Sequence, residues 1–430
     1  MNGLVFPDGA IQPEIMEAKY VQSPVKIKSV NAAQGKITIR NKNNFQDLSH
    51  LELKWTITAN GKLIEEGSIK DLPIAAQQEK QFELPITTKD FTNSEYYLNC
   101  YIMTKDATSW SDKGHLIAWD QFEISPYHLQ KQFYPPTGNS QISILRTRDS
   151  FEVSGDSFKA TINSNTGLLT SYTYKDKTLI SGGPQHNFWR APLDNDLGGG
   201  DKSYAQRWRS AGLHKLKSKV DTIYLTPGFK NKITVITLLE GDNGAIITCD
   251  TEYSFYGNGM FDVRLAANFN KEVPFLPRAG IQWFAPDDFS NIKWYGRGPF
   301  ENYIDRKDAA LIGLYEGTVQ GQYVPYPLPQ ENGNKTAVRW VSFQNDNGVG
   351  FTLVPLHHMN ISAHLYTQEN LTEATHTYEL ENTQTITINI DHKMMGVGGD
   401  DSWNPRTKEA YLIAPIKQQY TIRFIPEILN

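Results

Sequence analysis

Polar and apolar residues alternate along most of this sequence with a period of two. The segment "KITIRN" (36–41) alternates, as does "LELKWTIT" (51–58), which is followed closely by the dipeptide Asn60-Gly61. Successive side chains of a β-strand point to opposite faces, so this period indicates half-buried strands. Asn-Gly between two such segments indicates a tight hairpin turn. The alternation therefore predicts an all-β protein.

The predicted strands fall into two groups. Residues 1–125 contain about seven short strands, a spacing typical of an immunoglobulin-like β-sandwich. No Cys…Trp…Cys pattern accompanies them, so only the architecture is indicated. Residues 126–141 contain a Pro pair and a Gly-Asn-Ser cluster, which predict a linker. Residues 142–430 hold too many strands for one small sandwich, and we expect two large stacked sheets there, with one short helix near Tyr204–Ala211.

The composition excludes several classes of partner. The formal net charge is -5, and no basic cluster is present, which argues against nucleic acid. No apolar run of about 18 residues and no polybasic run occurs, so we expect no association with a membrane. The two cysteines, Cys100 and Cys249, provide neither a disulfide framework nor a zinc-binding pattern.

Four segments interrupt the alternation and combine polar residues with aromatic ones. Long polar loops on a rigid β scaffold are where functional sites usually lie. The segments are Asn187–Gly200, Trp294–Lys307, Tyr326–Trp340 and Met394–Pro405.

These segments contain acids but no recognisable catalytic pair. Glycoside hydrolysis requires two carboxyl groups about 5–5.5 Å or about 6.5–9.5 Å apart. The candidate acids are Glu301, Asp305, Glu331, Asp400 and Asp401. Asp400 and Asp401 are adjacent, so in an extended chain they point to opposite faces. Nothing in the spacing pairs the others, and the scattered histidines suggest no metal site.

The segment "GGDDSWNP" (398–405) contains a large aromatic residue among turn-forming residues. In one interpretation it is a surface turn, and Trp403 folds back onto the core. In the other it is a loop that presents the indole to a ligand. The spacing alone leaves both open.

Longer motifs, in order along the chain, resemble one known family. They are "MNGLVFPDG", "FWRAPLDND", "RWRSAGL", "GRGPFENYIDR", "YPLPQENGNK", "HLYTQENLTEATHTYEL" and "GVGGDDSWNP". With these motifs the sequence resembles the C-terminal portion of bacterial β-galactosidases of glycoside hydrolase family 2. The resemblance implies a second immunoglobulin-like domain (1–125) followed by a galactose mutarotase-like β-supersandwich (142–430).

The same resemblance carries expectations about mechanism. The family's catalytic glutamates and its Mg site (Ca or Na being alternatives) lie on a barrel that this sequence does not match. We therefore expect no catalytic residue, metal or other cofactor in this chain, and no hydrolysis by the chain alone. It would be a shortened form of such an enzyme or a separate small subunit. Whether it acts in the bacterial cytoplasm or periplasm stays open.

Specific residues follow from the resemblance as well. Trp403 matches an aromatic platform for the sugar, Asp400 and Asp401 would brace its loop, and Gly198 lies in a mobile loop beside the same pocket. The expected partners are a galactoside, the catalytic barrel and further copies of the enzyme. Alternatives are a carbohydrate-binding module without catalysis, an aldose 1-epimerase and a module for assembly.

Overall fold

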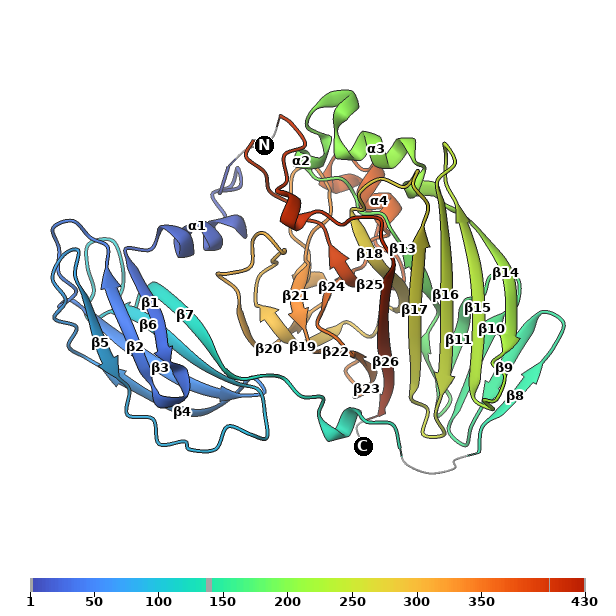
Figure 1. Cartoon of the computed structure of the whole chain (residues 1–430), viewed down its shortest axis with the longest axis horizontal. Coiled ribbons are helices and arrows are strands. Elements are labelled where there is room, and N and C mark those ends of the chain that lie inside the picture. Colours follow the sequence, from blue (N-terminus) through green and yellow to red (C-terminus); the bar gives the residue numbers. More distant parts are fainter. Residues whose placement is uncertain (1–2, 137–140, 402, 429–430) are drawn as a thin grey trace. The chain divides into compact units, whose positions relative to one another are not determined.

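A computed structural model of the chain describes residues 3–136, 141–401 and 403–428. Four residues of the predicted linker, 137–140, lie outside this described part. The chain divides into two compact units, which are described separately here. The sandwich unit comprises residues 3–130 and 308–314, and the large unit comprises 131–307 and 315–428. Helices are few in both, and antiparallel strands dominate (Figure 1).

The sandwich unit is built from two sheets. One has the strand order β1-β2-β5 and the other β4-β3-β6-β7. The strands are β1 (Val25–Asn31), β2 (Lys36–Asn41), β3 (Leu51–Ala59), β4 (Lys62–Ile69), β5 (Glu79–Glu83), β6 (Tyr96–Thr104) and β7 (Leu116–Ser125), preceded by helix α1 (Glu14–Gln22).

The alternation along β3 accounts for its place in this unit. Leu51, Leu53, Trp55 and Ile57 are all buried, whereas the residues between them are partly or fully exposed. The hairpin turn into β4 occurs at Asn60-Gly61, where φ is 46° and 79°. Both values lie in the left-handed region that Asn and Gly tolerate best, so this dipeptide fixes the turn.

A short segment from the second half of the sequence, residues 308–314, belongs to the sandwich unit. The side chain of Gln121 donates a 2.8 Å hydrogen bond to the carbonyl of Ile312 and accepts one of 2.8 Å from its amide. The indole of Trp119 donates to the carbonyl of Ala309 at 2.9 Å. The sandwich unit is therefore completed by residues far along the chain.

The large unit contains three sheets, and the last strand of one of them, β20, begins with residues 311–314 of the sandwich unit. Their orders are β12-β11-β10-β9-β8, β13-β18-β25-β24-β21 and β14-β15-β16-β17-β26-β23-β22-β19-β20. Their strands are β8 (Ser143–Arg146), β9 (Ser150–Ser154), β10 (Phe158–Asn163), β11 (Leu169–Tyr174), β12 (Lys177–Ile180), β13 (Gly182–Asn187), β14 (Lys217–Leu225), β15 (Lys232–Glu240), β16 (Ile246–Phe255), β17 (Phe261–Phe269), β18 (Arg278–Pro286), β19 (Asn291–Gly298), β20 (Leu311–Thr318), β21 (Lys335–Val338), β22 (Trp340–Gln344), β23 (Val349–Pro355), β24 (Met359–His364), β25 (Thr385–Met394) and β26 (Gln418–Ile428).

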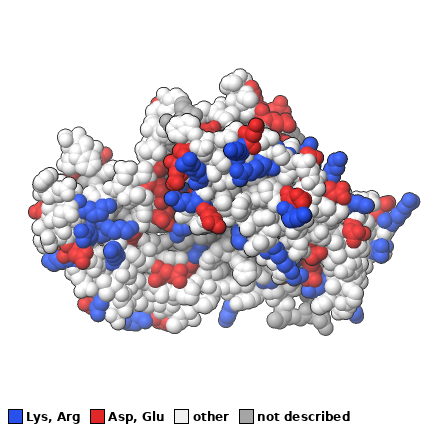
Figure 2. Space-filling view, turned by 45° about the horizontal axis from the view of Figure 1, so that its top comes forward, with Lys and Arg blue, Asp and Glu red and all other residues white. Residues whose placement is uncertain are grey.

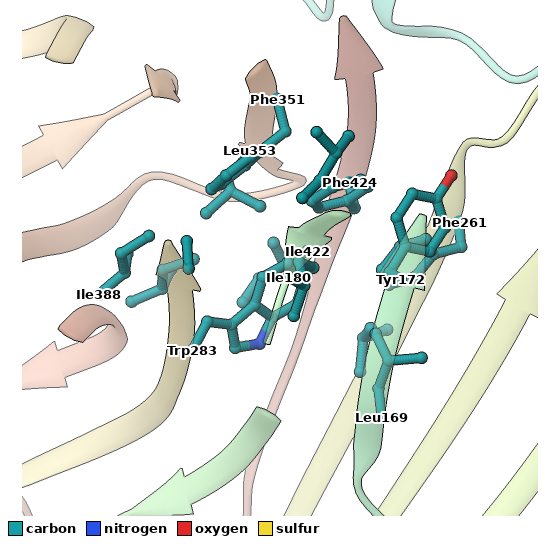
Figure 3. Packing of buried hydrophobic residues seen from close by; sticks show 14 of the residues in the cluster. Leu169, Tyr172, Ile180, Phe261, Trp283, Phe351, Leu353, Ile388, Ile422 and Phe424 are labelled. Carbon is teal, nitrogen blue, oxygen red and sulfur yellow. The ribbon is translucent and has the colours of Figure 1, made fainter. Parts of the chain in front are cut away.

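We expected two stacked sheets in the large unit, but the structure has three. Tyr172 of β11 and Trp283 of β18 both pack against Phe424 of the nine-stranded sheet, with ring centroids 5.0 and 5.7 Å apart. Two five-stranded sheets thus cover one large sheet, and the aromatic rings fill the space between them (Figure 3). Strand periodicity predicts which residues face the core, but it carries no information about where one sheet ends and the next begins.

The sheet that contains β13, β18, β25, β24 and β21 has two different faces. Its inner face carries apolar residues such as Ile281, Trp283 and Ile388. The intervening residues point the opposite way and include Arg278, Gln282, Asn389 and Asp391, which are polar and also buried. We call this second face the outer face. Because polar groups are seldom buried without partners, the outer face is where a site is expected.

The helices of the large unit are short. They are α2 (Asp194–Leu197), α3 (Tyr204–Ser210) and α4 (Gln368–Glu373), and α3 confirms the helix expected near residue 204. No helix in the described part of the chain is long and apolar enough to cross a membrane. On the face drawn in Figure 2, acidic and basic side chains are interspersed, and no extended field of one sign appears.

Candidate functional site

The four polar segments of the sequence meet within the large unit. The amide of Glu331 donates to the carbonyl of Ala191 at 3.1 Å, which joins the first segment to the third. Asn195 donates to the carbonyl of Val397 at 2.7 Å, which joins the first to the fourth. Asp305, in the second segment, accepts from the amide of Gly398 at 2.8 Å. These hydrogen bonds connect all four segments into one cluster of loops.

A buried ion pair holds the first segment in place. The Arg190 guanidinium donates to the two carboxylate oxygens of Asp196 at 2.9 and 2.7 Å, and both side chains are almost fully buried. The same guanidinium donates to the carbonyls of Met395 and Gly396 at 2.8 and 3.1 Å. A bidentate Arg–carboxylate pair has a fixed geometry, so Arg190 sets the position at which the fourth segment leaves β25.

Asp305 holds the next residues of the fourth segment. Its carboxylate accepts hydrogen bonds from the amides of Val397 and Gly398 at 3.1 and 2.8 Å. A Cβ atom on Gly396 would lie only 2.6 Å from Asp305 Oδ2. Glycine at residue 396 therefore permits the close approach between this carboxylate and the loop.

The tip of the loop is tied by one aspartate and exposes one indole. Asp401 Oδ1 accepts from the amides of Trp403 and Asn404 at 3.0 and 2.9 Å, and Arg406 lies 3.4 Å from Asp401 Oδ2. Asp400 pairs with Lys408 at 3.3 Å. The Trp403 side chain is 73% exposed, so the interpretation of Trp403 as a core residue was wrong. The loop is anchored at its base and closed by a turn, yet its largest side chain contacts little of the large unit.

Gly198 follows α2, and the chain then passes beside the same turn. A Cβ atom on Gly199, whose φ is 97°, would lie 2.8 Å from Cδ of Pro405. The hydroxyl of Tyr204 donates to the carbonyl of Pro405 at 3.1 Å. Gly198, Asp400, Asp401 and Trp403, predicted from separate motifs, thus belong to neighbouring stretches of chain.

The remaining candidate acids are engaged in holding the loops. Glu301 accepts from Arg306, from the Tyr326 hydroxyl and from the amide of Gly333, each at 2.6 Å. Glu331 accepts from Arg278 at 3.0 Å. These contacts give both glutamates a structural role within the described part of the chain.

Sequence reasoning missed an ionic cluster on the outer face. Arg278 lies 3.0 Å from Asp391 and 3.0 Å from Glu331, and all three side chains are buried. Burial raises the pKa of Asp391 to about 7, and the adjacent Arg278 opposes that rise. Glu331 is one of the candidate acids, but nothing in the sequence marks Arg278 and Asp391 as its neighbours, because single polar residues within strands break no turn rule and form no motif.

The described side chains do not fit a metal ion. Among residues 3–136, 141–401 and 403–428, no three His, Cys, Asp or Glu side chains lie close enough together to hold one. His364, for example, is buried with Nε2 3.0 Å from the carbonyl of Asn332.

Comparison with known proteins identifies two families along the chain. A family described as "Beta galactosidase small chain" matches residues 154–425. A second, described as "Beta-galactosidase, domain 4", matches residues 37–125. The two matches follow each other without overlap.

Curated relatives agree with these matches. The β-galactosidase of Priestia megaterium is 32% identical over 413 residues, which cover 96% of this chain and 39% of that protein. The β-galactosidase of Vibrio cholerae is 30% identical over 432 residues, which cover 98% of this chain and 40% of that protein. The chain thus spans about two fifths of the length of the relatives that it matches.

Among solved structures, a putative aldose 1-epimerase from Escherichia coli is similar over 68% of this chain and 100% of its own. The TM-score is 0.34 and the sequence identity is 10%.

Proposed function

The chain belongs to the β-galactosidase small chain family, and from this premise we propose that it supplies a sugar-binding aromatic loop to a β-galactosidase. That enzyme would be a retaining glycoside hydrolase acting on terminal non-reducing β-D-galactose residues. Its catalytic glutamates and magnesium site would lie on a barrel outside this chain. The partners of the chain would be that barrel, the galactoside and further copies of the enzyme.

One observation carries this proposal: Trp403 is 73% exposed at the tip of a loop that is otherwise firmly held. Tryptophan combines a large apolar ring with a polar N–H group, and for that reason it is enriched where proteins contact other molecules. The loop base is fixed by Arg190 and Asp305, and the tip by Asp401. An anchored loop loses little conformational entropy when its indole meets a ligand, which favours binding.

The chemistry of the indole suits a pyranose ring. The axial C–H groups of a sugar form an apolar patch that a flat aromatic face can cover. By analogy with the stacking of bases on aromatic side chains, such a contact is worth about 1–3 kcal/mol. Asp400 and Asp401 would act on the loop, because they pair with Lys408 and Arg406 beside the turn.

The acids of the loop cluster support a binding role over a catalytic one. Glu301, Glu331 and Asp305 each accept hydrogen bonds from buried or backbone donors. A general acid must come within hydrogen-bond reach of the proton that it transfers, and these carboxylates already bond to donors of the protein. We therefore expect the chain alone to be catalytically silent.

Two assays test the proposal. The purified chain is incubated with nitrophenyl β-galactoside, and release of nitrophenol should equal that of a mock preparation. Turnover that disappears on mutation of Glu301 or Glu331 to Gln would contradict the proposal. The second assay compares the kinetics of the Trp403→Ala and wild-type forms in a β-galactosidase that includes this chain.

A further inference from the structure

The large unit contains a pocket on the outer face, lined in part by Asn187, Phe188 and Trp189 at the start of the first polar segment. It has a volume of about 300 Å³ and is lined by residues of β13, β18, the short turn at Leu213–Lys215 and helix α4. Ligand pockets typically start at about 300 Å³, so this one suits a small ligand. Ten of its fourteen lining residues are polar.

The floor of the pocket is a row of amide side chains across the outer face. In the register of the sheet, Gln185 lies opposite Gln282, and Gln282 lies opposite Asn389. Gln368, from α4, completes the row, and Asn187 bonds to it at 2.8 Å. Asn187, Gln282 and Gln368 are 7%, 8% and 7% exposed. Burying three primary amides at the bottom of one pocket is costly unless most of their groups are paired.

The hydrogen bonds of this row fix which way each amide points. Arg278 Nη1 donates to Gln368 Oε1 at 3.0 Å. This donor assigns the oxygen of the Gln368 amide to the side that faces Arg278 and the Nε2 group to the opposite side. That Nε2 group has one long contact, 3.4 Å to Asn187 Oδ1. Gln282 Nε2 donates to Asn389 Oδ1 at 3.1 Å, which directs Gln282 Oε1 away from Asn389.

Two hydrogen-bonding groups are left over. None of the hydrogen bonds of Gln282 engages its Oε1, and this acceptor is not among the fully buried unpaired atoms of the described residues, so it is open to the pocket. One N–H of Gln368 Nε2 is a donor, since its amide makes only one contact through that atom. A hydroxyl can donate to the first group and accept from the second, so the floor matches the pattern of a polyol.

The charges around the pocket argue against an anion. Arg278 lies behind the floor, but its three nitrogens contact Gln368, Glu331 and Asp391. Lys215 is at the rim and pairs with Asp242 at 2.9 Å. Glu369 and Glu373 are exposed on the same rim and would repel a negative ligand. No lining cation is therefore available to a phosphate or a carboxylate among the described residues.

An apolar wall completes the pocket. Trp189 lies beside the His214 ring with centroids 5.4 Å apart, and its Nε1 donates to Thr372 at 3.1 Å, which fixes the indole. Amides that recognise hydroxyls, together with an aromatic and aliphatic wall, are the combination that binds a compact sugar.

We propose that this pocket binds a neutral polyhydroxylated small molecule of the size of a monosaccharide. Gln282 and Gln368 would bind its hydroxyls, and Trp189 and Leu216 would contact its C–H groups. This site consists of residues other than the Trp403 loop, so it does not depend on the function proposed above.

Binding can be measured on the purified chain by saturation-transfer NMR and calorimetry with D-galactose and D-glucose. Choline and inorganic phosphate serve as cationic and anionic probes. Gln185→Trp places a bulky side chain at the exposed end of the amide row, on β13, and Gln282→Met removes the acceptor that is open to the pocket. Gln81→Trp makes the same change on exposed strand β5 of the sandwich unit and is the matched control.

We expect at least one of the two sugars to bind, and both pocket variants to weaken that binding by about tenfold or more. Gln81→Trp should bind as the wild type does. If Gln282→Met fails to fold, Gln185→Trp decides alone. The inference is overturned if neither sugar binds, or if choline or phosphate binds in their place. It is also overturned if Trp403→Ala, and not the pocket variants, abolishes sugar binding.

Discussion

The carboxylate of Asp305 accepts a 2.8 Å hydrogen bond from the amide of Gly398, ninety-three residues further along the chain. Asp305 also accepts from Val397, so one side chain fixes two successive amides at the start of the Trp403 loop. The "NYIDR" and "GVGGDDSW" motifs are therefore in direct contact, and the first anchors the second. The first sets the position from which the second presents its indole.

Removing this anchor should loosen the loop without unfolding the protein. We expect Asp305→Ala to increase hydrogen exchange at Val397 and Gly398 by about tenfold or more, because two amides lose a charged acceptor. Asp156→Ala removes an exposed acid elsewhere in the large unit and should leave exchange at these amides unchanged. Equal protection of these amides in Asp305→Ala and wild type would show that Asp305 is not the anchor.

Breaking the buried pair beneath the loop should be far more damaging. Asp196→Asn leaves the Arg190 guanidinium buried without its carboxylate partner, and such a change typically costs about 3–5 kcal/mol. Denaturant unfolding of the two proteins measures this cost directly. Asp71→Asn is the control, since Asp71 is 92% exposed beside Lys105 and should leave the unfolding midpoint near that of the wild type. Similar midpoints for all three proteins would contradict this assignment.

Stability should fall in mild acid. Burial lowers the pKa of His186 to about 4, and burial also lowers that of His392 to about 4. In the unfolded chain the pKa of a histidine is about 6.5. Between the folded and the unfolded pKa values, the unfolded state therefore binds more protons than the folded state. The contribution of each neutral imidazole is present above pH 6.5 or so and is lost as the pH falls toward 4.

Urea midpoints at pH 7 and pH 5 test this dependence. His186→Gln should show a smaller loss of stability between the two pH values than the wild type, since glutamine does not titrate and can still bond to Thr251. His50→Gln, at an exposed histidine, should lose as much as the wild type. If the His186→Gln protein lost as much stability between pH 7 and pH 5 as the wild type, His186 would not contribute to the pH dependence.

Proteolysis at the predicted linker should nick the chain without separating the pieces. We predict cleavage between residues 126 and 141, with a C-terminal fragment beginning near residue 140. That fragment carries residues 308–314, which belong to the sandwich unit and bond to Trp119 and Gln121. The two fragments should therefore migrate together in gel filtration and separate only under denaturing conditions. If the fragments separate in native buffer, segment 308–314 does not hold them together.

Much of this fold could be predicted from local sequence pattern, and much of the site could not. Strand β3 and its Asn-Gly turn follow from alternation and turn chemistry, which act over a few residues. The division of the large unit into three sheets depends on pairing between distant strands, about which periodicity is silent. Arg278 and Gln368 were missed for a related reason. Each is one polar residue, and its importance comes from partners brought near by the fold.

The motifs indicated a role for the Trp403 loop, but the spacing of its residues did not show whether the indole is buried or exposed. Gly-Gly-Asp-Asp predicts a turn, but both a buried and an exposed indole are compatible with a turn. Only the fold shows that the anchors, Arg190 and Asp305, hold the base of the loop while the indole stays exposed.

The central claim is that Trp403 binds sugar and does not support the fold. The most direct test is steady-state kinetics of Trp403→Ala and Trp403→Phe in a β-galactosidase that includes this chain, with thermal unfolding of the same variants. If the indole is a platform, Trp403→Ala raises KM by about five- to a hundredfold and lowers kcat much less, Trp403→Phe recovers part of the affinity, and Tm does not change. A large drop in Tm, or a fall in kcat at unchanged KM, would contradict the account.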